Sequence, residues 1–162
     1  MNETARLAHV VLTGESLTRL SPILEADRAQ AVADLEHENH FSLCGTADRA
    51  AQPGPYILHL SVQEGRLVFE LRNLSDAPLT AIVLALGPFR SLIKDYQMLV
   101  DSHMMAVDEG RAERIQAIDM GRRGLHDEGA NLLRARLENK AKIDHETARR
   151  LFTLVCVLHQ RI

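Results

Sequence analysis

The chain has 162 residues, 46% of them hydrophobic and 25% charged, which is enough for one domain with its own hydrophobic core. Its two cysteines exclude the disulfide framework of small secreted domains, and its aromatic content of 4% argues against a stacking surface for single-stranded nucleic acid. The net charge of −3 is uneven, because the first 110 residues carry −7 and residues 111–162 carry +4. The C-terminal part therefore has the charge to meet an anionic partner.

The first part of the chain predicts a strand, a helix and a loop, in that order. Residues 7–12, LAHVVL, are typical of a short strand that can add to the edge of a sheet. Pro22 behind Ser21 is typical of a helix start, and apolar residues continue at helical spacing to about His37. Residues 43–55 are small, polar and rich in proline, so we expect an exposed loop there.

The strongest strand signal follows this loop. Apolar residues alternate with others in YILHLSV (56–62) and RLVFELR (66–72), and the short link Gln63-Glu64-Gly65 predicts a tight hairpin between them. A further turn leads into LTAIVLAL (79–86), whose nearly continuous apolar run is typical of a strand that lies centrally or is buried on both faces. These three strands predict an antiparallel meander.

The rest of the chain predicts helices. An apolar stripe over residues 89–107 has the period of a helix, and a second long helix is expected over about residues 111–139, either continuous or broken near Gly121–Gly124. Asp144 is placed as the N-cap of a last helix over about residues 145–160, whose apolar half LFTLVCVL belongs in the core. The expected fold class is α+β: a single domain, 1–162, with an antiparallel sheet of three to four strands packed by a layer of three to four helices.

The segment from Ile115 to Leu133 is the candidate functional segment. It carries three glycines, and each costs about 1 kcal/mol against alanine inside a helix. Close packing, a kink or the close approach of a ligand would each account for them, the first two being the commoner reasons. The candidate ligand-binding residues are Arg122, Arg123, Gly124, His126, Asp127 and Gly129.

His126 is the centre of this candidate site. In a helix it has two arginines one turn before it and little bulk one turn after it, and Asp127 follows directly. An exposed histidine beside positive charge fits an anion site or a phosphoryl acceptor. The run RRGLHD also resembles the R-x-L-H-D phosphoacceptor helix of some bacterial sensor histidine kinases, although no glycine-rich nucleotide-binding box follows it. The plainer interpretation is a histidine that forms a hydrogen bond within a helical bundle.

Other chemistry finds less support. His37-Glu38-Asn39-His40 is one residue short of the zinc-binding pattern H-E-x-x-H, and a helix end of this composition is usually a solvated cap, so we expect no metal site. The chain has no G-x-S-x-G, no P-loop and no dinucleotide-binding fingerprint. We therefore expect no cofactor, and whether the protein is an enzyme stays open at this point.

Four runs carry a resemblance over nearly the whole chain: LHLSVQEGRLVFELR, PFRSLIKDYQMLVDS, AIDMGRRGLHDEGANLL and DHETARRLFTLVCVLH. Together they resemble an uncharacterised family of small bacterial proteins found chiefly in alphaproteobacteria. The resemblance implies a bacterial, cytosolic origin and supplies no catalytic residues. The N-terminal segment also lacks the features of a signal peptide and no apolar run has the length of a membrane span, so we expect a cytoplasmic protein without membrane contact.

The leading functional hypothesis is a non-enzymatic regulatory or protein-interaction module that forms a homodimer through its long helices. Met104 and Met105 on the first long helix motivate it, because methionine suits adaptable contacts. The first alternative is histidine phosphotransfer or anionic-ligand binding at His126. The second is weak nucleic-acid binding through the basic C-terminal part, against which the interleaved acidic residues and the overall negative charge argue.

Overall fold

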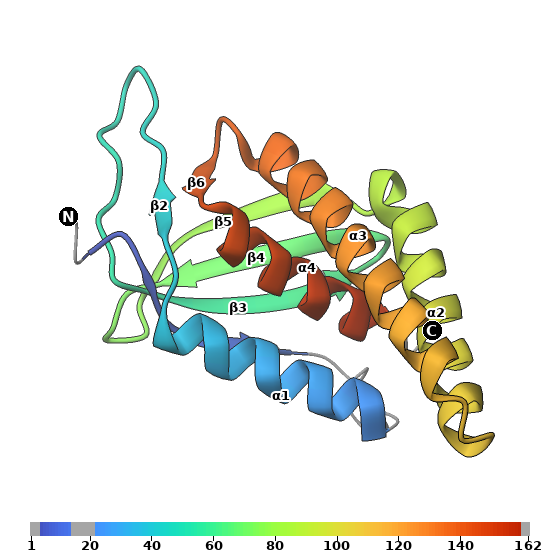
Figure 1. The fold of residues 1–162 in the computed structure, drawn as a ribbon. Helices are drawn as coiled ribbons and strands as arrows, with labels where there is room; N and C mark the ends of the chain where they lie inside the picture. Colours follow the sequence, from blue (N-terminus) through green and yellow to red (C-terminus); the bar gives the residue numbers. More distant parts are fainter. Residues whose placement is uncertain (1–3, 14–21, 160–162) are drawn as a thin grey trace.

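The computed structural model describes residues 4–13 and 22–159 and has a mixed four-stranded sheet with helices packed on one of its faces (Figure 1). The elements, in chain order, are β1 Leu7–Leu12, α1 Pro22–His37, β2 Phe41–Leu43, β3 Tyr56–Gln63, β4 Arg66–Arg72, β5 Pro78–Ala85, α2 Arg90–Asp108, α3 Ala112–Leu137, β6 Ala141–Ile143 and α4 His145–His159. One turn of 3₁₀-helix, Gly87–Phe89, precedes α2. The α+β class predicted from the sequence is confirmed.

The predicted meander is confirmed. Strands β3, β4 and β5 are antiparallel neighbours, with Gln63 opposite Arg66 and Leu67 opposite Leu84. The link between β3 and β4 is a two-residue turn in which Glu64 has φ 50° and Gly65 has φ 74°. Positive φ at both positions is the geometry that matches the twist of a hairpin.

Two features of the sheet differ from the sequence-based expectation. The N-terminal strand β1 does add to an edge, but it runs parallel to β3, so the sheet is not purely antiparallel. The apolar run in β5 is not central: the strand order β1-β3-β4-β5 makes β5 the other edge. On β5 only Ile82 and Leu84 are buried, and Val83 is 45% exposed, because the helices cover one face of the sheet alone.

A second, two-stranded sheet was not predicted. Strands β2 and β6 pair in antiparallel fashion, with Phe41 opposite Ile143 and Leu43 opposite Ala141. The predicted loop therefore begins one residue later, since Leu43 is the last, buried residue of β2. The predicted N-cap Ser21 lies outside the described residues.

The helical layer is built around α4. Its apolar half, residues 151–158, is buried throughout, as predicted from the sequence. Helix α3 is continuous over 26 residues, so the alternative of a break near Gly121–Gly124 was wrong. A Cβ added at Gly129 would come within 2.4 Å of the Phe152 ring, so this glycine lets α3 and α4 approach closely. At Gly124 an added Cβ would meet open space.

Candidate functional site

A polar hollow lies where α1, α3 and α4 meet. It has a volume of about 150 Å³. Helix α1 supplies Asp27, Gln30, Ala31 and Asp34, α3 supplies Arg122 and His126, and α4 supplies Arg150 and Thr153. Two of the six predicted site residues therefore line one hollow, Arg122 and His126.

Arg122 is held by an acidic residue from another helix. Its Nη2 lies 2.5 Å from Oδ2 of Asp27, and both side chains are largely buried, with 15% and 20% exposed. The hydroxyl of Tyr96, from α2, donates a hydrogen bond to the same carboxylate oxygen. Burial, together with the neighbouring carboxylate of Asp27, raises the pKa of Tyr96. The three residues tie α1, α2 and α3 together, and the buried Nε of Arg122 has no hydrogen-bond partner among the described residues.

His126 lies between two aromatic rings. The centroid of its ring is 5.8 Å from that of Tyr96 and 6.4 Å from that of Phe152. Its Nε2 is 3.4 Å from Oγ1 of Thr153. Its pKa is lowered to about 4, chiefly by burial and then by the charges of Arg122 and Arg149, against the opposing effect of Asp27 and Asp127. The imidazole is therefore neutral at pH 7.

The other predicted site residues do not join this hollow. Arg123, Gly124 and Asp127 lie on the exposed side of α3, and Gly129 is buried against α4. Asp127 accepts a hydrogen bond from His145 at 3.1 Å. The pKa of Asp127 is lowered, first by this hydrogen bond and then by the charge of Arg149.

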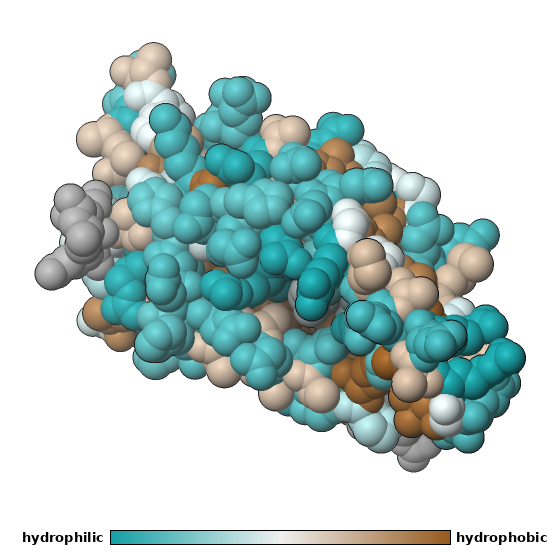
Figure 2. All heavy atoms as spheres, in the orientation of Figure 1, coloured by the Kyte–Doolittle hydropathy of each residue, from teal (hydrophilic) through white to brown (hydrophobic). Residues whose placement is uncertain are grey.

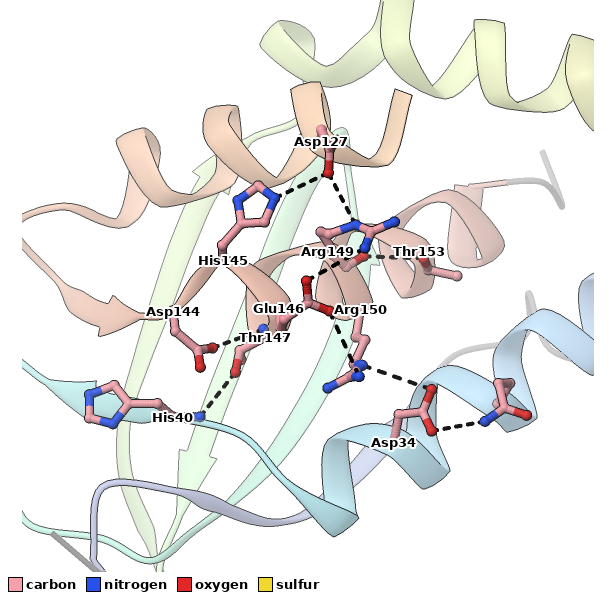
Figure 3. A network of polar contacts seen from close by, with 11 residues as sticks. Asp34, His40, Asp127, Asp144, His145, Glu146, Thr147, Arg149, Arg150 and Thr153 are labelled. Atoms are coloured by element: carbon pink, nitrogen blue, oxygen red, sulfur yellow. Dashed lines mark hydrogen bonds and ion pairs between the residues drawn. The ribbon is translucent and has the colours of Figure 1, made fainter. Parts of the chain in front are cut away.

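Figure 3 shows the polar contacts that continue along the start of α4. Arg149 lies 3.3 Å from Asp127 of α3, and Arg150 lies 3.8 Å from Asp34 of α1. Glu146 is within 3.8 Å of both arginines. Arg149 and Arg150, two of the basic residues of the C-terminal part, are thus paired with acidic side chains from three helices.

Sequence reasoning missed Asp27, Tyr96 and Thr153. Tyr96 was counted in the apolar stripe of its helix, and Asp27 lies 95 positions before the arginine that it binds. One sequence carries no signal for such a pair. Helical spacing alone, however, places Arg150 and Thr153 on one face of α4, which was a usable signal for the second half of the hollow.

Within the described residues, the segment His37-Glu38-Asn39-His40 joins the end of α1 to β1 and to α4 through hydrogen bonds. The side-chain amide of Asn39 donates to the carbonyl oxygens of Leu7 and Leu35, and its Oδ1 accepts from the Leu7 N–H at 2.7 Å. The backbone N–H of His40 donates to Oγ1 of Thr147. Among the described residues, no group of three or more metal-binding side chains lies together.

The outer face of α2 is a second candidate surface. Met98, Met105 and the acidic Asp101 between them share one exposed side of the helix, where the two methionines are 58% and 60% exposed. Figure 2 shows a mostly hydrophilic surface over α1, α3 and α4, with hydrophobic atoms gathered at the end where α1 begins and α2 joins α3. There, Ile23, Met104 and neighbouring residues line a hollow of about 260 Å³. No helix in the described ranges combines the length and the apolar character that crossing a bilayer requires.

Comparison with known proteins gives the family. The model of the uncharacterised protein family UPF0262 matches residues 4–161. A UPF0262 protein of Granulibacter bethesdensis is 66% identical, covering 97% of this chain and 91% of its own length. Relatives in Acidiphilium cryptum and Rhodospirillum rubrum are 60% and 44% identical; they cover 96% and 99% of this chain and 93% and 96% of their own lengths. No solved structure matches. The chain belongs to the UPF0262 family, with homologues in alphaproteobacteria, as the sequence resemblance predicted.

Proposed function

We propose that this member of the UPF0262 family is a non-enzymatic, regulatory protein-interaction module that forms a homodimer through its long helix α2. The observation that carries the proposal is the exposure of Met98 and Met105, seven residues apart on the solvent side of that helix. Large apolar side chains exposed at helical spacing are typical of a helix that packs against a partner. The unbranched, flexible side chain of methionine can adapt its conformation to the surface of such a partner.

The charges on α2 favour a second copy in antiparallel orientation. Lys94 lies near the start of the outer face, and Asp108 and Glu109 lie at its end. A two-fold axis between Asp101 and Ser102 sets Met98 opposite the partner's Met105 and Lys94 opposite the partner's Glu109. Such an interface is self-complementary, which a two-fold dimer requires. One helix face is smaller than the roughly 1,600 Å² of a stable interface, so we expect a weak, concentration-dependent dimer.

Sedimentation velocity over a series of concentrations tests the homodimer. We expect the wild-type protein to pass from monomer to dimer as concentration rises, and Met98→Glu or Met105→Glu to weaken the dimer at least about tenfold, because a carboxylate would be buried against an apolar side chain. Leu74→Glu is the matched control, since Leu74 is also 58% exposed but lies in the turn between β4 and β5. A wild-type protein that stays monomeric throughout would refute the proposal.

The polar hollow supports a second candidate function, the binding of an anionic ligand or a phosphoryl group at Arg122 and His126. Three observations favour it: the two residues share the hollow with Arg150, the buried Nε of Arg122 lacks an acceptor, and the low pKa of His126 keeps its imidazole neutral. A neutral imidazole is the nucleophilic form that accepts a phosphoryl group.

Incubation with acetyl phosphate tests the phosphotransfer form of this candidate. We expect an acid-labile adduct on the wild-type protein that mass spectrometry places on His126 and that His126→Gln abolishes. Anion binding without transfer would appear as a rise in melting temperature with phosphate, lost in Arg122→Gln. A wild-type protein that shows neither effect removes this function.

A further inference from the structure

The two edges of the four-stranded sheet differ in whether their outer backbone groups have hydrogen-bond partners. At the β1 edge, side chains of α1 and of the segment that follows it pair with the backbone: Glu36 accepts from the Val10 N–H at 3.0 Å, and Asn39 accepts from the N–H and donates to the carbonyl of Leu7. At the β5 edge, no hydrogen bond from outside the sheet reaches Leu79–Ala85 among the described residues. Natural proteins usually blunt an exposed edge strand with charge, proline or a cover.

The register of β5 identifies the unpaired backbone groups. The Leu86 N–H donates to the Gly65 carbonyl at 3.1 Å, so the residues two and four positions earlier, Leu84 and Ile82, also direct their backbone groups to β4. Because the direction alternates along a strand, Ala81 and Val83 present their N–H and C=O groups outward. Over residues 80–83 the edge thus offers two donors and two acceptors on alternate residues.

A cleft of about 540 Å³ lies against these groups. Its walls are residues 80–83 of β5, the loop that follows β2, and the turn between α3 and β6. The loop has a defined shape there, because the Arg49 N–H donates to Oγ1 of Thr46 at 3.1 Å and the Cys44 N–H donates to the Lys140 carbonyl at 2.9 Å. Pro78, the first residue of β5, is the one such protection on this strand; the segment LTAIVLAL that follows it carries no charge, and its residues 80–83 line the cleft.

The charge of the cleft selects the kind of chain. Its only charged lining residues are Arg49 and Lys140, both basic, and neither forms an ion pair with any described residue. The protein as a whole carries −3, so this basic pair stands out against an acidic molecule. Two cations without partners beside open strand edges fit carboxylates on an extended peptide.

We propose that the cleft binds an extended, acidic segment of a partner protein, which adds as a fifth strand to the edge of β5. The backbone groups of Ala81 and Val83 bond the segment, and Arg49 and Lys140 hold its carboxylates. Backbone pairing supplies affinity, and side-chain contacts supply selectivity, in this mode of recognition. The inference goes beyond the proposed dimer, since it uses the opposite part of the molecule from α2 and does not depend on that interface.

Fluorescence anisotropy with a labelled octapeptide of alternating valine and glutamate tests the proposal. We expect the peptide to bind the wild-type protein and to bind Val83→Pro at least about tenfold more weakly, because proline removes an outward N–H. Proline is accepted in an edge strand when its nitrogen faces outward, so the β4 pairing is retained. Val83→Thr, which keeps the N–H, is the matched control and should bind within about twofold of wild type.

A second variant tests the charges without touching the sheet. Arg49→Glu combined with Lys140→Glu should weaken the binding of the acidic peptide at least about tenfold. The double variant should instead prefer a peptide that has lysine in place of glutamate. Cys44 gives an independent readout, because it lines the cleft while the only other cysteine, Cys156, is buried. Bound peptide should slow the reaction of Cys44 with a thiol reagent.

The outcomes separate this proposal from the dimer. Met98→Glu, which opposes the α2 dimer, should bind the octapeptide as the wild type does. Absence of binding to the wild-type protein at millimolar peptide overturns the proposal, and so does equal binding to the wild type and to a folded Val83→Pro. A dimer that Val83→Pro abolishes and Met98→Glu retains would also overturn it, because the occupant of the edge would be a second copy.

Discussion

Gly124 and Gly129 lie five residues apart on α3, and their surroundings are opposite. Gly124 has open space where a side chain would be, whereas a side chain at Gly129 would overlap the ring of Phe152. Close packing of α3 against α4 therefore requires glycine at position 129. No contact requires it at position 124, where nothing offsets the cost of a glycine to the helix.

This contrast predicts stability changes of opposite sign. Gly124→Ala should raise the free energy of unfolding by about 0.5–1 kcal/mol, because alanine is the better helix former. Gly129→Ala should lower it by about 1–3 kcal/mol, because α3 and α4 must move apart. Urea denaturation of both variants measures the difference, and two changes of the same sign would contradict the packing role of Gly129.

His126 predicts a loss of stability in weak acid. Its pKa is about 4 in the folded protein against an ordinary value of 6.5 for histidine, so the unfolded chain binds more protons between these two pH values. Stability from this group is complete above pH 6.5 and is lost as the pH falls toward 4, by about 2–3 kcal/mol.

The pH effect is isolated by comparing the wild type with His126→Gln. The free energy of unfolding, measured by urea denaturation at pH 7.5 and 4.5, should fall less in the variant. His159 also has a pKa lowered by burial and contributes a smaller effect of the same sign to both proteins. An equal fall in both proteins would contradict the neutral, enclosed state of His126.

At the scale of elements, α1, α2 and α3 share one polar junction. Asp27 accepts from both Tyr96 and Arg122, so its loss would leave a largely buried guanidinium without its nearer and more buried counterion. Asp27→Asn should lower the free energy of unfolding by about 1–3 kcal/mol. Asp119→Asn is the control, because that carboxylate lies 3.7 Å from Arg122 and is 46% exposed, and its loss should cost less than about 0.5 kcal/mol. Equal losses in thermal or urea unfolding would contradict the role of the junction.

The position of Asp101 gives a further test of the α2 dimer. A two-fold axis beside this residue brings the two copies of Asp101 together, and like charges oppose association. Asp101→Asn should therefore tighten the dimer by several-fold, with the largest gain at low ionic strength. Sedimentation velocity at two salt concentrations measures this. No change would argue against the antiparallel register.

The elements also show how far the sequence predicts the fold. Alternation identified β3 and β4, and the apolar half of α4 identified the centre of the core. The order of strand, helix and strand in β1, α1 and β3 was an available signal for a parallel pair, because such a pair needs a long crossover. The pairing of β2 with β6 had no such signal, since each has three residues and about a hundred positions separate them.

The candidate site was predictable only within one helix. Helical spacing placed Arg122 and His126 on a shared face, and the structure brings both to one hollow. Their partners come from other helices, and the exposure of β5 depends on which layers cover the sheet. The apolar run LTAIVLAL therefore does not distinguish a strand that helices cover on both faces from an edge strand that lies beside a cleft.

At the scale of the whole molecule, one sheet has a capped edge and an open edge, and amide hydrogen exchange distinguishes them. The Leu7 and Val10 amides donate to the side chains of Asn39 and Glu36, and the Ile82 amide donates to β4, so these three should exchange slowly. The amides of Ala81 and Val83 face the cleft and should exchange far faster than that of Ile82 between them. Nuclear magnetic resonance with and without the acidic octapeptide measures each amide separately. Addition of the peptide should protect Ala81 and Val83 and leave Ile82 unchanged, because only the outward groups gain a partner. Uniform exchange along β5 in the free protein would mean that its outer edge is already covered, and the asymmetry between the two edges would then be absent in solution.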